Sequence, residues 1–373
     1  MRVLSVFGTR PEAIKMAPVV RAIEASGTLE GRVCVTGQHA EMLKQVTDLF
    51  GIAPHHDLQI MKAGQGLTYV TTAVLTGMET VLAAEKPDAV LVHGDTTTSM
   101  AAALAAFYAG IPVGHVEAGL RTRDLSAPWP EEANRQITGR LARWHFAPTA
   151  GARRNLLDEA VPEAQIHVTG NTVIDALHHI QSTVLETEAT EAEMAARFGF
   201  LDPAKRMILV TGHRRENFDG GLDRMCTALA ALAGRGDCQV VYPVHLNPVV
   251  RAAADRVLAN APGVHLIEPQ PYLPFLWLMA RSHLIITDSG GIQEEGPSFG
   301  KPVLVTRDVT ERPEAVEAGT VRLVGTDTET ILTEATRLLD NAEAHADMAR
   351  AHNPYGDGKA AGRITEILTG DAP

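Results

Sequence analysis

The chain has 373 residues, of which 45% are hydrophobic and 21% are charged, a composition that is ordinary for a globular protein. This length exceeds what one hydrophobic core usually supports, so we expect two domains. The 33 basic and 45 acidic side chains give a net charge of −12, which argues against binding of nucleic acid or of an anionic membrane surface.

No part of the sequence predicts export or membrane insertion. The first apolar run reaches Arg10 too early for a secretory signal, and no apolar run has the roughly 18 residues of a membrane span. Cys34, Cys226 and Cys238 form no Cys-x-x-Cys pair, so neither a disulfide framework nor a zinc ribbon is indicated. We therefore expect a cytoplasmic protein.

Short β-branched runs alternate with longer helical patterns along the chain. In the first half the expected strands are 3–7, 33–36, 89–92, 113–116, 145–148 and 166–168, and the expected helices are 12–25, 41–50, 99–109 and 131–142. A second series of strands follows at 207–210, 239–242, 264–267, 283–286, 303–305 and 321–323. This alternation predicts an α/β fold with two doubly wound, Rossmann-like domains of parallel strands.

The boundary between the two domains is expected near residue 170. Residues 171–200 are helical in pattern, have no strand of their own and connect the two halves. The turn-rich run 353–358 precedes a closing helix, so the C-terminus is able to cross back to the first half. We therefore expect a first domain of residues 1–170 with 355–373, and a second of 171–354.

Polar motifs follow several strands of the first domain, where ligands bind in open α/β sheets. Arg10 and Lys15 follow the first strand in a run that is neither a dinucleotide fingerprint nor a P-loop. Asp95, Glu117 and Glu131 lie at or just beyond later strand ends. Helix capping and the helix dipole explain each carboxylate singly, but three neighbouring carboxylates also suit proton donation and removal.

In the second domain, residues 287–295 place small residues where a strand gives way to a helix. Gly290 and Gly291 allow an anion to approach the free N–H groups of the helix start, while an ordinary Asp or Ser cap is the structural alternative. Glu295 lies about one helical turn further on, within reach of a sugar hydroxyl. The turn therefore suits a diphosphate.

Two histidines, His213 and His245, follow other strands of the second domain. A histidine near a leaving phosphate can donate a proton or a charged hydrogen bond. Because the histidines stand singly, with no Cys or His cluster at ligand spacing, no metal site is predicted.

Motifs spread over nearly the whole chain resemble those of the bacterial non-hydrolysing UDP-N-acetylglucosamine 2-epimerases. They are GTRPEAIKMAP at 8–18, HGDTTTS at 93–99, PVGHVEAGLRT at 112–122, PWPEEANR at 128–135, TGNTVIDAL at 169–177, TGHRREN at 211–217, YPVHLNP at 242–248, DSGGIQEE at 288–295, RPEAVEAGT at 312–320 and NPYGDG at 353–358. The resemblance implies a glycosyltransferase-B architecture with the active site in the interdomain cleft, and reversible conversion of UDP-N-acetylglucosamine (UDP-GlcNAc) to UDP-N-acetylmannosamine.

The resemblance also implies roles for individual residues. Asp95, Glu117 and Glu131 are the expected catalytic carboxylates, with His213 near the diphosphate. The residues expected around UDP are Arg10, Gln270, Phe275, Ser289, Gly290, Gly291 and Glu295, with Lys15, Arg135 and Arg312 as charged contacts. The family's regulatory contacts match Gln38, Glu41, Arg214 and His245, although Gly64 stands where some relatives have an arginine. The family further implies a homodimer, and the product would supply cell-surface polysaccharide.

A mechanism in which UDP is eliminated and added back agrees with the residues named above. Carbon 2 of the sugar is not adjacent to a carbonyl, and the chain shows no nicotinamide site, so no cofactor is expected. Departure of UDP from carbon 1, with removal of the proton from carbon 2, forms a 2-acetamidoglucal to which UDP adds back after reprotonation. The alternatives are a transferase of the same architecture, a hydrolysing 2-epimerase, and an inactive nucleotide-sugar sensor.

Overall fold

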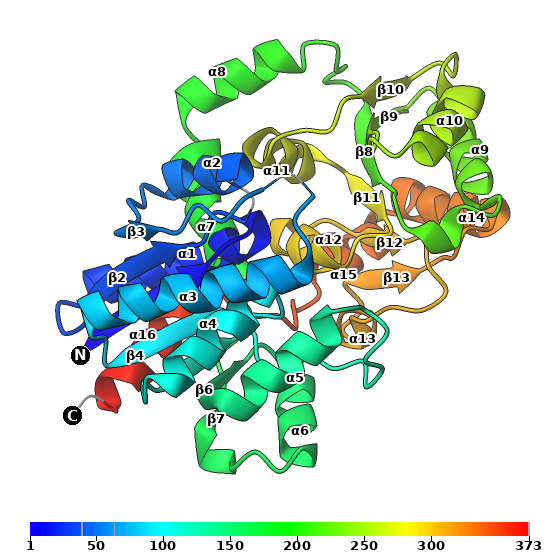
Figure 1. Cartoon of the computed structure of the whole chain (residues 1–373). Helices are drawn as coiled ribbons and strands as arrows, with labels where there is room; N and C mark the ends of the chain where they lie inside the picture. The colour runs from blue at the N-terminus through cyan, green and yellow to red at the C-terminus, as the bar shows by residue number, and fades with distance from the viewer. Residues whose placement is uncertain (39, 63, 372–373) are drawn as a thin grey trace. The chain divides into compact units, whose positions relative to one another are not determined.

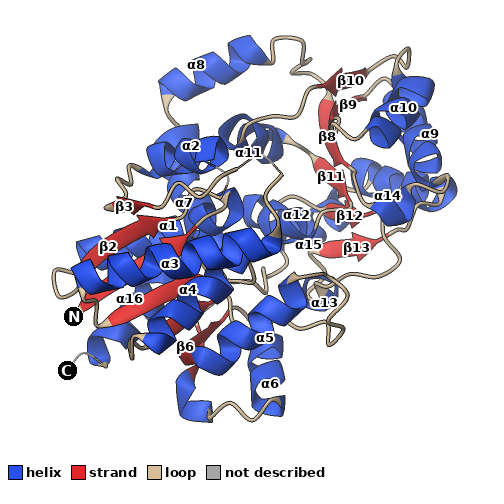
Figure 2. Ribbon diagram, in the orientation of Figure 1, coloured by secondary structure: helices blue, strands red, loops and turns tan. Residues whose placement is uncertain are grey.

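The computed structural model describes residues 1–38, 40–62 and 64–371, except for the side chains of residues 40–42. The chain forms two compact units, one of Met1–His179 with Tyr355–Pro373 and one of Ile180–Pro354. Each unit contains one fully parallel sheet with helices on its faces (Figures 1 and 2). The predicted α/β class with two doubly wound sheets is confirmed.

The sheet of the first unit has seven parallel strands. Their spatial order is β3 (His56–Asp57), β2 (Glu30–Val35), β1 (Arg2–Phe7), β4 (Ala89–His93), β5 (Val113–Val116), β6 (Ala142–Ala147) and β7 (Ile166–Val168). β3, which has only two residues, was not expected from the sequence. The chain changes its direction of travel across the sheet between β1 and β4, and ligands bind at such a switch point in open sheets.

The helices of the first unit are α1 (Arg10–Ala25), α2 (Ala40–Phe50), α3 (Leu67–Glu85), α4 (Thr97–Tyr108), α5 (Glu131–Leu141), α6 (Ala150–Asp158), α7 (Thr172–Ile180) and α16 (Ala360–Gly370). Residues of α3 and α4 share one hydrophobic core with β1, β2 and β4, so these helices cover one face of the sheet (Figure 1). α3 was missed because its threonines and valines have low helix propensity and weaken the helical signal.

Helix α3 corrects the expectation about apolar runs. It is long and apolar enough to span a membrane by length and composition alone, with a mean hydropathy of 1.3 over the tested window. The run was overlooked because threonines and a glycine interrupt its apolar residues, although they lower the mean hydropathy only slightly. Only 28% of that window is buried, and the buried residues of α3 pack against α4 in the hydrophobic core of the first unit.

The C-terminal helix α16 belongs to the first unit. The carboxylate of Asp175 accepts hydrogen bonds from the first two backbone N–H groups of α16, at Ala360 (3.2 Å) and Ala361 (2.9 Å). The Arg363 guanidinium donates to the carbonyl of Thr169 at 2.9 Å. An acidic side chain at a helix start satisfies orphan N–H groups and favours the dipole, so Asp175 fixes where the returning chain docks.

The sheet of the second unit has six parallel strands. Their order is β10 (Val264–Ile267), β9 (Cys238–Pro243), β8 (Arg206–Thr211), β11 (Leu284–Thr287), β12 (Val303–Val305) and β13 (Val321–Leu323). The helices are α8 (Glu188–Arg197), α9 (Gly221–Ala233), α10 (Pro248–Leu258), α11 (Tyr272–Arg281), α12 (Gly290–Glu295), α13 (Pro313–Glu317), α14 (Thr328–Asp340) and α15 (Ala342–Arg350). Here the switch point lies between β8 and β11.

Candidate functional site

Glu117 lies directly after β5 and is held by several polar groups. Its backbone has φ of +62°, a left-handed conformation that is uncommon for a residue with a side chain. One carboxylate oxygen accepts from the Lys15 ammonium of α1 and from the Asn171 amide at 2.8 Å. The other oxygen lies 3.8 Å from Nε2 of His93. Strained backbone and polar anchors together hold this carboxylate in one orientation.

His93, at the end of β4, is 4% exposed. Burial lowers the pKa of its imidazole, and the nearby Lys15 ammonium acts in the same direction, against the opposing effect of Glu117. His93 is therefore neutral near pH 7. Because the His93 imidazole is neutral, the positive charge that pairs with the Glu117 carboxylate is that of the Lys15 ammonium.

Asp95 lies two residues beyond β4 and pairs with a cation of α5. The Arg135 guanidinium donates to the Asp95 carboxylate at 2.5 Å, and the Asn134 amide donates to the Asp95 carbonyl at 3.0 Å. The side chain that caps α4 is Thr96, which accepts from Ser99 N–H at 3.0 Å. The capping alternative therefore applies to Thr96 and not to Asp95.

The adjacent residues Glu131 and Glu132 have different environments. Glu132 is fully buried and accepts from the backbone N–H groups of Thr122 (3.0 Å) and Arg123 (3.1 Å) and from the Gln136 amide (2.8 Å). Burial raises the pKa of this carboxyl, but these hydrogen bonds outweigh burial, so the pKa lies below its usual value. Glu132 therefore holds the preceding loop in place.

Glu131 is partly exposed and has no hydrogen-bond or ion-pair partner among the residues that the structure describes. It stands four residues before Arg135 on α5, so the two side chains lie on one face of the helix, the face that meets Asp95. Of these two glutamates, only Glu131 has a carboxylate with no partner among the described residues, so it is the one available for proton transfer.

Two of the three cations predicted in the first unit, Arg10 and Lys15, lie on α1, just after the turn that follows β1. The buried Glu12 accepts from the backbone N–H groups of Gly8 (3.0 Å) and Thr9 (2.8 Å) and from two hydroxyls that follow β4. Arg10 opens α1, is partly exposed and has no side-chain partner among the described residues. Glu12 thus builds the turn that presents Arg10 and Lys15 at the carboxyl end of the sheet.

In the second unit, the strand ends of β8 and β11 are joined across the switch point. The Thr211 and Thr287 hydroxyls are 2.6 Å apart, and the Thr287 hydroxyl also accepts from Ser289 N–H at 2.9 Å. Asp288 is fully buried, and one of its oxygens accepts from the backbone N–H groups of His213 and Arg214, both at 2.8 Å. Asp288 therefore anchors the loop after β8 and does not cap α12.

The start of α12 is open in the way an anion site requires. Ser289 is the N-cap residue, but its side chain makes no capping hydrogen bond. A Cβ built on Gly290 would come no closer than 4.0 Å to the groups around it, and the Arg312 guanidinium and a Glu311 carboxylate oxygen both lie at that distance. Arg312 also pairs with the buried Glu294. The first N–H groups of α12 and one guanidinium thus lie at the same place.

Gln270 and Phe275 make their described contacts elsewhere. The Gln270 side chain accepts from the Arg197 guanidinium at 2.8 and 3.0 Å and donates to the Glu268 carbonyl at 2.6 Å. Phe275 is partly buried in α11, and Glu295 is partly buried at the end of α12. The hydrogen bonds of Gln270 therefore link it to α8 and β10, and not to the Ser289–Gly291 turn.

The expected regulatory residues are divided between the two units. Gln38 accepts from the Thr98 hydroxyl at 3.0 Å in the first unit. In the second unit, the His245 ring stacks on the His213 ring with centroids 5.4 Å apart, and Arg214 follows His213 in the anchored loop. Glu41 lies in α2, and its side chain is outside the described residues.

Some contacts could not be inferred from motif spacing alone. Asn171, His93 and Asp288 each touch an expected catalytic residue, but none was assigned a role from the sequence. Their positions after or at the end of strands, inside the recognised motifs, were the available signal. Among the described residues, no group of three or more His, Cys, Asp or Glu is arranged to hold a metal.

Comparison with known proteins was consistent along the whole chain. A family model described as UDP-N-acetylglucosamine 2-epimerase matches residues 21–369. The UDP-N-acetylglucosamine 2-epimerase of Escherichia coli (strain K12) is 60% identical over 369 residues, which are 99% of this chain and 98% of that protein.

Solved structures agree. The Neisseria meningitidis UDP-GlcNAc 2-epimerase, bound to UDP-GlcNAc, is 52% identical, with a TM-score of 0.90 over 100% of both chains. The Methanocaldococcus jannaschii enzyme, in complex with UDP-GlcNAc and UDP, is 34% identical, with a TM-score of 0.80 over 99% of both chains. These matches confirm the expected glycosyltransferase-B-like, two-domain fold.

Proposed function

This chain belongs to the UDP-N-acetylglucosamine 2-epimerases, and we propose that it inverts carbon 2 of the sugar by eliminating UDP and adding it back. The epimerase activity on UDP-GlcNAc follows from the family. The proposed route needs two kinds of group. One kind stabilises a departing diphosphate, and the other moves a proton at carbon 2.

The second unit supplies the groups for the diphosphate. In the proposal, the N–H groups of Gly290 and Gly291 and the side chain of Ser289 bind the phosphate oxygens, and Glu295 binds a ribose hydroxyl. His213 donates a proton or a charged hydrogen bond as the bond from carbon 1 to the diphosphate oxygen breaks. Arg312 supports this role because its guanidinium lies beside Gly290. Gln270 and Phe275 are proposed around the nucleotide, and Arg10 near the diphosphate.

The first unit supplies the proton chemistry. A carboxylate takes the proton from carbon 2 while UDP leaves with the bonding electrons, so a double bond forms between carbons 1 and 2. A second carboxyl group then protonates carbon 2 on the other face, and UDP adds to carbon 1. The observation that carries the proposal is the pair Asp95 and Glu117, at neighbouring strand ends, each held by a cation, Arg135 or Lys15. Glu131 is the third candidate.

The test uses purified protein and UDP-GlcNAc in heavy water, with no nicotinamide or metal added. We expect both epimers to form and deuterium to enter at carbon 2 of each, as followed by NMR. Turnover that leaves carbon 2 unlabelled, or activity that EDTA abolishes and a divalent ion restores, would contradict the proposal. Release of free N-acetylmannosamine would instead identify a hydrolysing enzyme.

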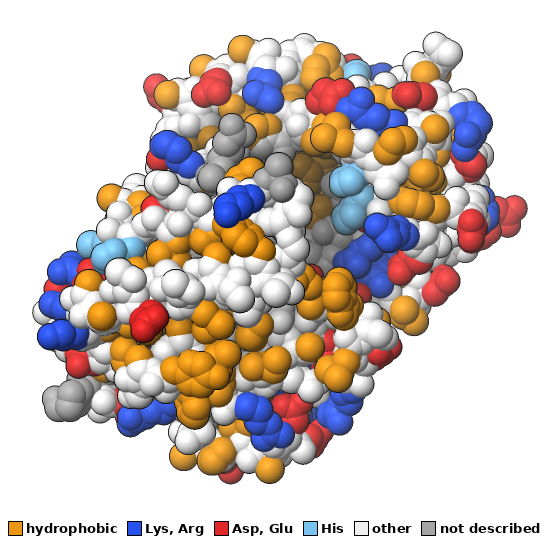
Figure 3. All heavy atoms as spheres, viewed as in Figure 1, with side chains coloured by type: hydrophobic (Ala, Val, Ile, Leu, Met, Phe, Trp, Pro, Cys, Tyr) orange, Lys and Arg blue, Asp and Glu red, His pale blue; other side chains and the backbone are white. Residues whose placement is uncertain are grey.

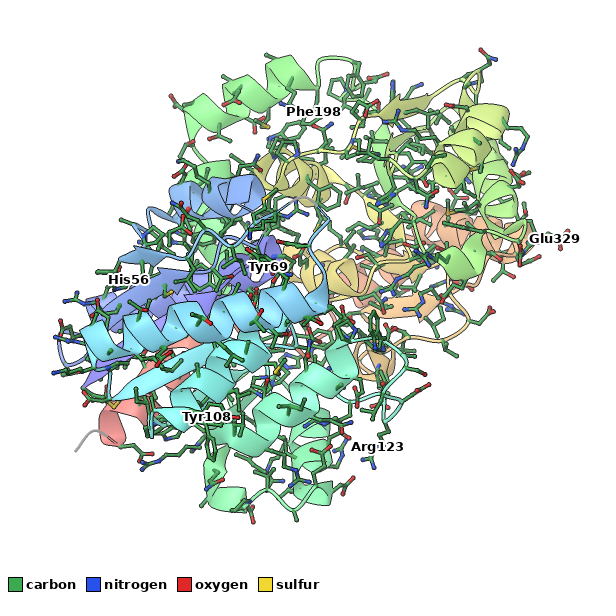
Figure 4. The ribbon with its side chains drawn as sticks, in the orientation of Figure 1. His56, Tyr69, Tyr108, Arg123, Phe198 and Glu329 are labelled. Atoms are coloured by element: carbon green, nitrogen blue, oxygen red, sulfur yellow. The ribbon has the colours of Figure 1, made fainter. Side chains whose placement is uncertain are left out.

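The surface of α3 and α4 supports the expected homodimer. Apolar side chains gather on this face (Figure 3), where a groove of about 770 Å³ is lined by residues that include Leu75, Ala83 and Ile111. Tyr108, labelled in Figure 4, is 74% exposed, and the neighbouring Phe107 is 55% exposed. Contiguous exposed apolar patches of this kind mark association surfaces. Tyr108→Glu should give a monomer by analytical ultracentrifugation.

A second UDP-GlcNAc molecule is proposed to activate the enzyme through Gln38, Glu41, Arg214 and His245. These residues come from both units, so a ligand that touches all of them would favour one relative arrangement of the units. Pure UDP-N-acetylmannosamine should then turn over only after a lag, which a trace of UDP-GlcNAc abolishes. Hyperbolic kinetics without a lag would show that these residues do not regulate the enzyme, and Gly64 in place of an arginine would be the first explanation.

The cellular setting is also a proposal. All three cysteines are free and buried, and burial raises the pKa of the Cys34 and Cys226 thiols to about 12. Unpaired cysteines suit the reducing cytoplasm, where the product would serve synthesis of cell-surface polysaccharide. Residues 1–170 with 355–373 are proposed as the N-terminal Rossmann-like domain and 171–354 as the C-terminal UDP-binding domain, although residues 171–179 lie in the first compact unit.

A further inference from the structure

The loop after β8 is held by one buried carboxylate. Asp288, directly after β11, is 0% exposed. Its Oδ2 accepts from the backbone N–H groups of His213 and Arg214, both at 2.8 Å, and from the Asn217 amide at 3.3 Å. The register that pairs Thr287 with Thr211 brings the two strand ends together. This oxygen therefore fixes the backbone from which the His213 side chain projects.

The other oxygen of Asp288 faces the ring of the same histidine. Oδ1 lies 3.4 Å from Nδ1 of His213 and makes no hydrogen bond to any residue that the structure describes. A buried carboxylate oxygen with no other partner strongly favours a proton on the atom opposite. A proton held on Nδ1 leaves Nε2, on the far side of the ring, as the nitrogen that exchanges protons with a ligand.

The remaining neighbours of His213 all oppose its positive charge. Burial lowers the pKa of the imidazole, and the Arg214 guanidinium and the stacked His245 ring act in the same direction. Among the described groups that act on His213, Asp288 is the one that favours the imidazolium. Its buried charge therefore decides whether His213 has a proton to give.

We propose that Asp288 is a positioning residue that holds the proton on Nδ1 of His213 and directs Nε2 at the departing diphosphate of the sugar nucleotide. This inference rests on the proposed role of His213 at the leaving group. When the bond from carbon 1 breaks, the imidazolium donates its Nε2 proton to the diphosphate oxygen and becomes the neutral Nδ1–H ring, and Asp288 balances the ring charge before this transfer. In the return step Nε2 accepts the same proton back.

The first experiment uses the unmodified protein. Long-range ¹H–¹⁵N NMR of the histidine rings, with His213 assigned from the spectrum of His213→Gln, reports which nitrogen is protonated in the neutral ring. We expect the Nδ1–H form. A neutral His213 in the Nε2–H form would overturn the proposal.

The second experiment compares Asp288→Asn with Asp255→Asn, a change at an exposed aspartate on α10. An Asn at 288 keeps a carbonyl oxygen for the two backbone N–H groups but removes the charge from Nδ1. Opposite charges within about 4–6 Å shift a pKa by about 1–3 units, so the proton affinity of His213 should fall about tenfold or more. The basic limb of the kcat profile, where activity falls as His213 loses its proton, should move to lower pH by the same amount, while Asp255→Asn changes neither the titration of His213 nor the profile.

A double variant separates this inference from the proposed function. If Asp288 acts through His213, then Asp288→Asn should cause no further loss of kcat in His213→Gln. A further loss of tenfold or more would overturn the inference. If His213→Gln by itself keeps normal turnover, the proposed role of His213 fails instead. If His213→Gln is inactive but the titration of His213 is unchanged in Asp288→Asn, only the role of Asp288 fails.

Discussion

The two units place their functional groups at equivalent points of similar sheets, but they use carboxylates in opposite ways. In the first unit, Asp95 and Glu117 each pair with a cationic side chain at the strand ends. In the second, the buried Asp288 is occupied by backbone N–H groups and an imidazole, and the start of α12 stays open. We therefore propose that similar topology supports proton transfer in one unit and anion binding in the other, because the residues that follow the strands differ.

The largest expected effect separates turnover from binding. Asp95→Asn, Glu117→Gln and Glu131→Gln should each lower kcat about a hundredfold or more, since general acid–base groups contribute roughly that much. UDP affinity, measured by calorimetry, should stay within about threefold of the wild-type value, because the proposed diphosphate site at the start of α12 is in the other unit. Glu24→Gln, at an exposed position on α1, is the control. A variant that keeps near-normal kcat loses its catalytic assignment.

A smaller effect tests the anchoring of Glu117. Asn171→Asp replaces an amide donor by a second carboxylate, and neighbouring carboxylates raise each other's pKa by about 1–3 units. If Glu117 acts as the ionised base, the acid limb of turnover should then move to higher pH, with kcat near pH 7 lowered about tenfold or more. Asn171→Ala removes the donor without adding a charge, so it should lower kcat with a smaller shift of the profile. Identical pH profiles in all three proteins would show that Asn171 has no influence on the carboxylate.

The open start of α12 predicts a loss of UDP binding, in contrast to the loss of turnover that is expected for the carboxylate variants. Gly290→Ala adds a methyl group that meets no protein atom closer than 4.0 Å, so the fold should be retained. The methyl group would occupy space proposed for the diphosphate and should weaken UDP binding about tenfold, the value of roughly one charge-assisted hydrogen bond. Gly362→Ala, on α16 with nothing within 4 Å of the added group, is the control. Unchanged UDP affinity would place the diphosphate elsewhere.

The smallest effect concerns stability alone. Glu132→Gln weakens a buried acceptor of two backbone N–H groups and should lower the free energy of unfolding by about 1–3 kcal/mol. Because the folded pKa of Glu132 lies below its unfolded value, its contribution is complete above the unfolded pKa and is lost as pH falls through the folded pKa. Urea unfolding at pH 7 and pH 3 should therefore show a difference between variant and wild type that shrinks at pH 3. Equal differences at both pH values would contradict this.

The sequence alone determined nearly all the strands and the polar residues at their ends, but not helix α3. The alternation of β-branched runs and helical patterns predicted the strands of both sheets, and only the two-residue β3 was missed among them. Parallel strands present their carboxyl ends on one side of a sheet, so the polar motifs that contain Asp95, Glu117 and His213 were expected to gather there. Local pattern is sufficient for these predictions because periodicity and motif position are properties of neighbouring residues.

Only the tertiary structure decided which polar groups meet. Asn171 bonds to Glu117 across 54 residues of sequence, and the Asp288 carboxylate anchors the His213 backbone across 75. Glu131 and Glu132 are the same residue type side by side, yet Glu132 is buried on two backbone donors and Glu131 is partly exposed. Such differences arise from the crossing of strands and helices far apart in the chain, and burial then decides whether a carboxylate supports the fold or is left for catalysis.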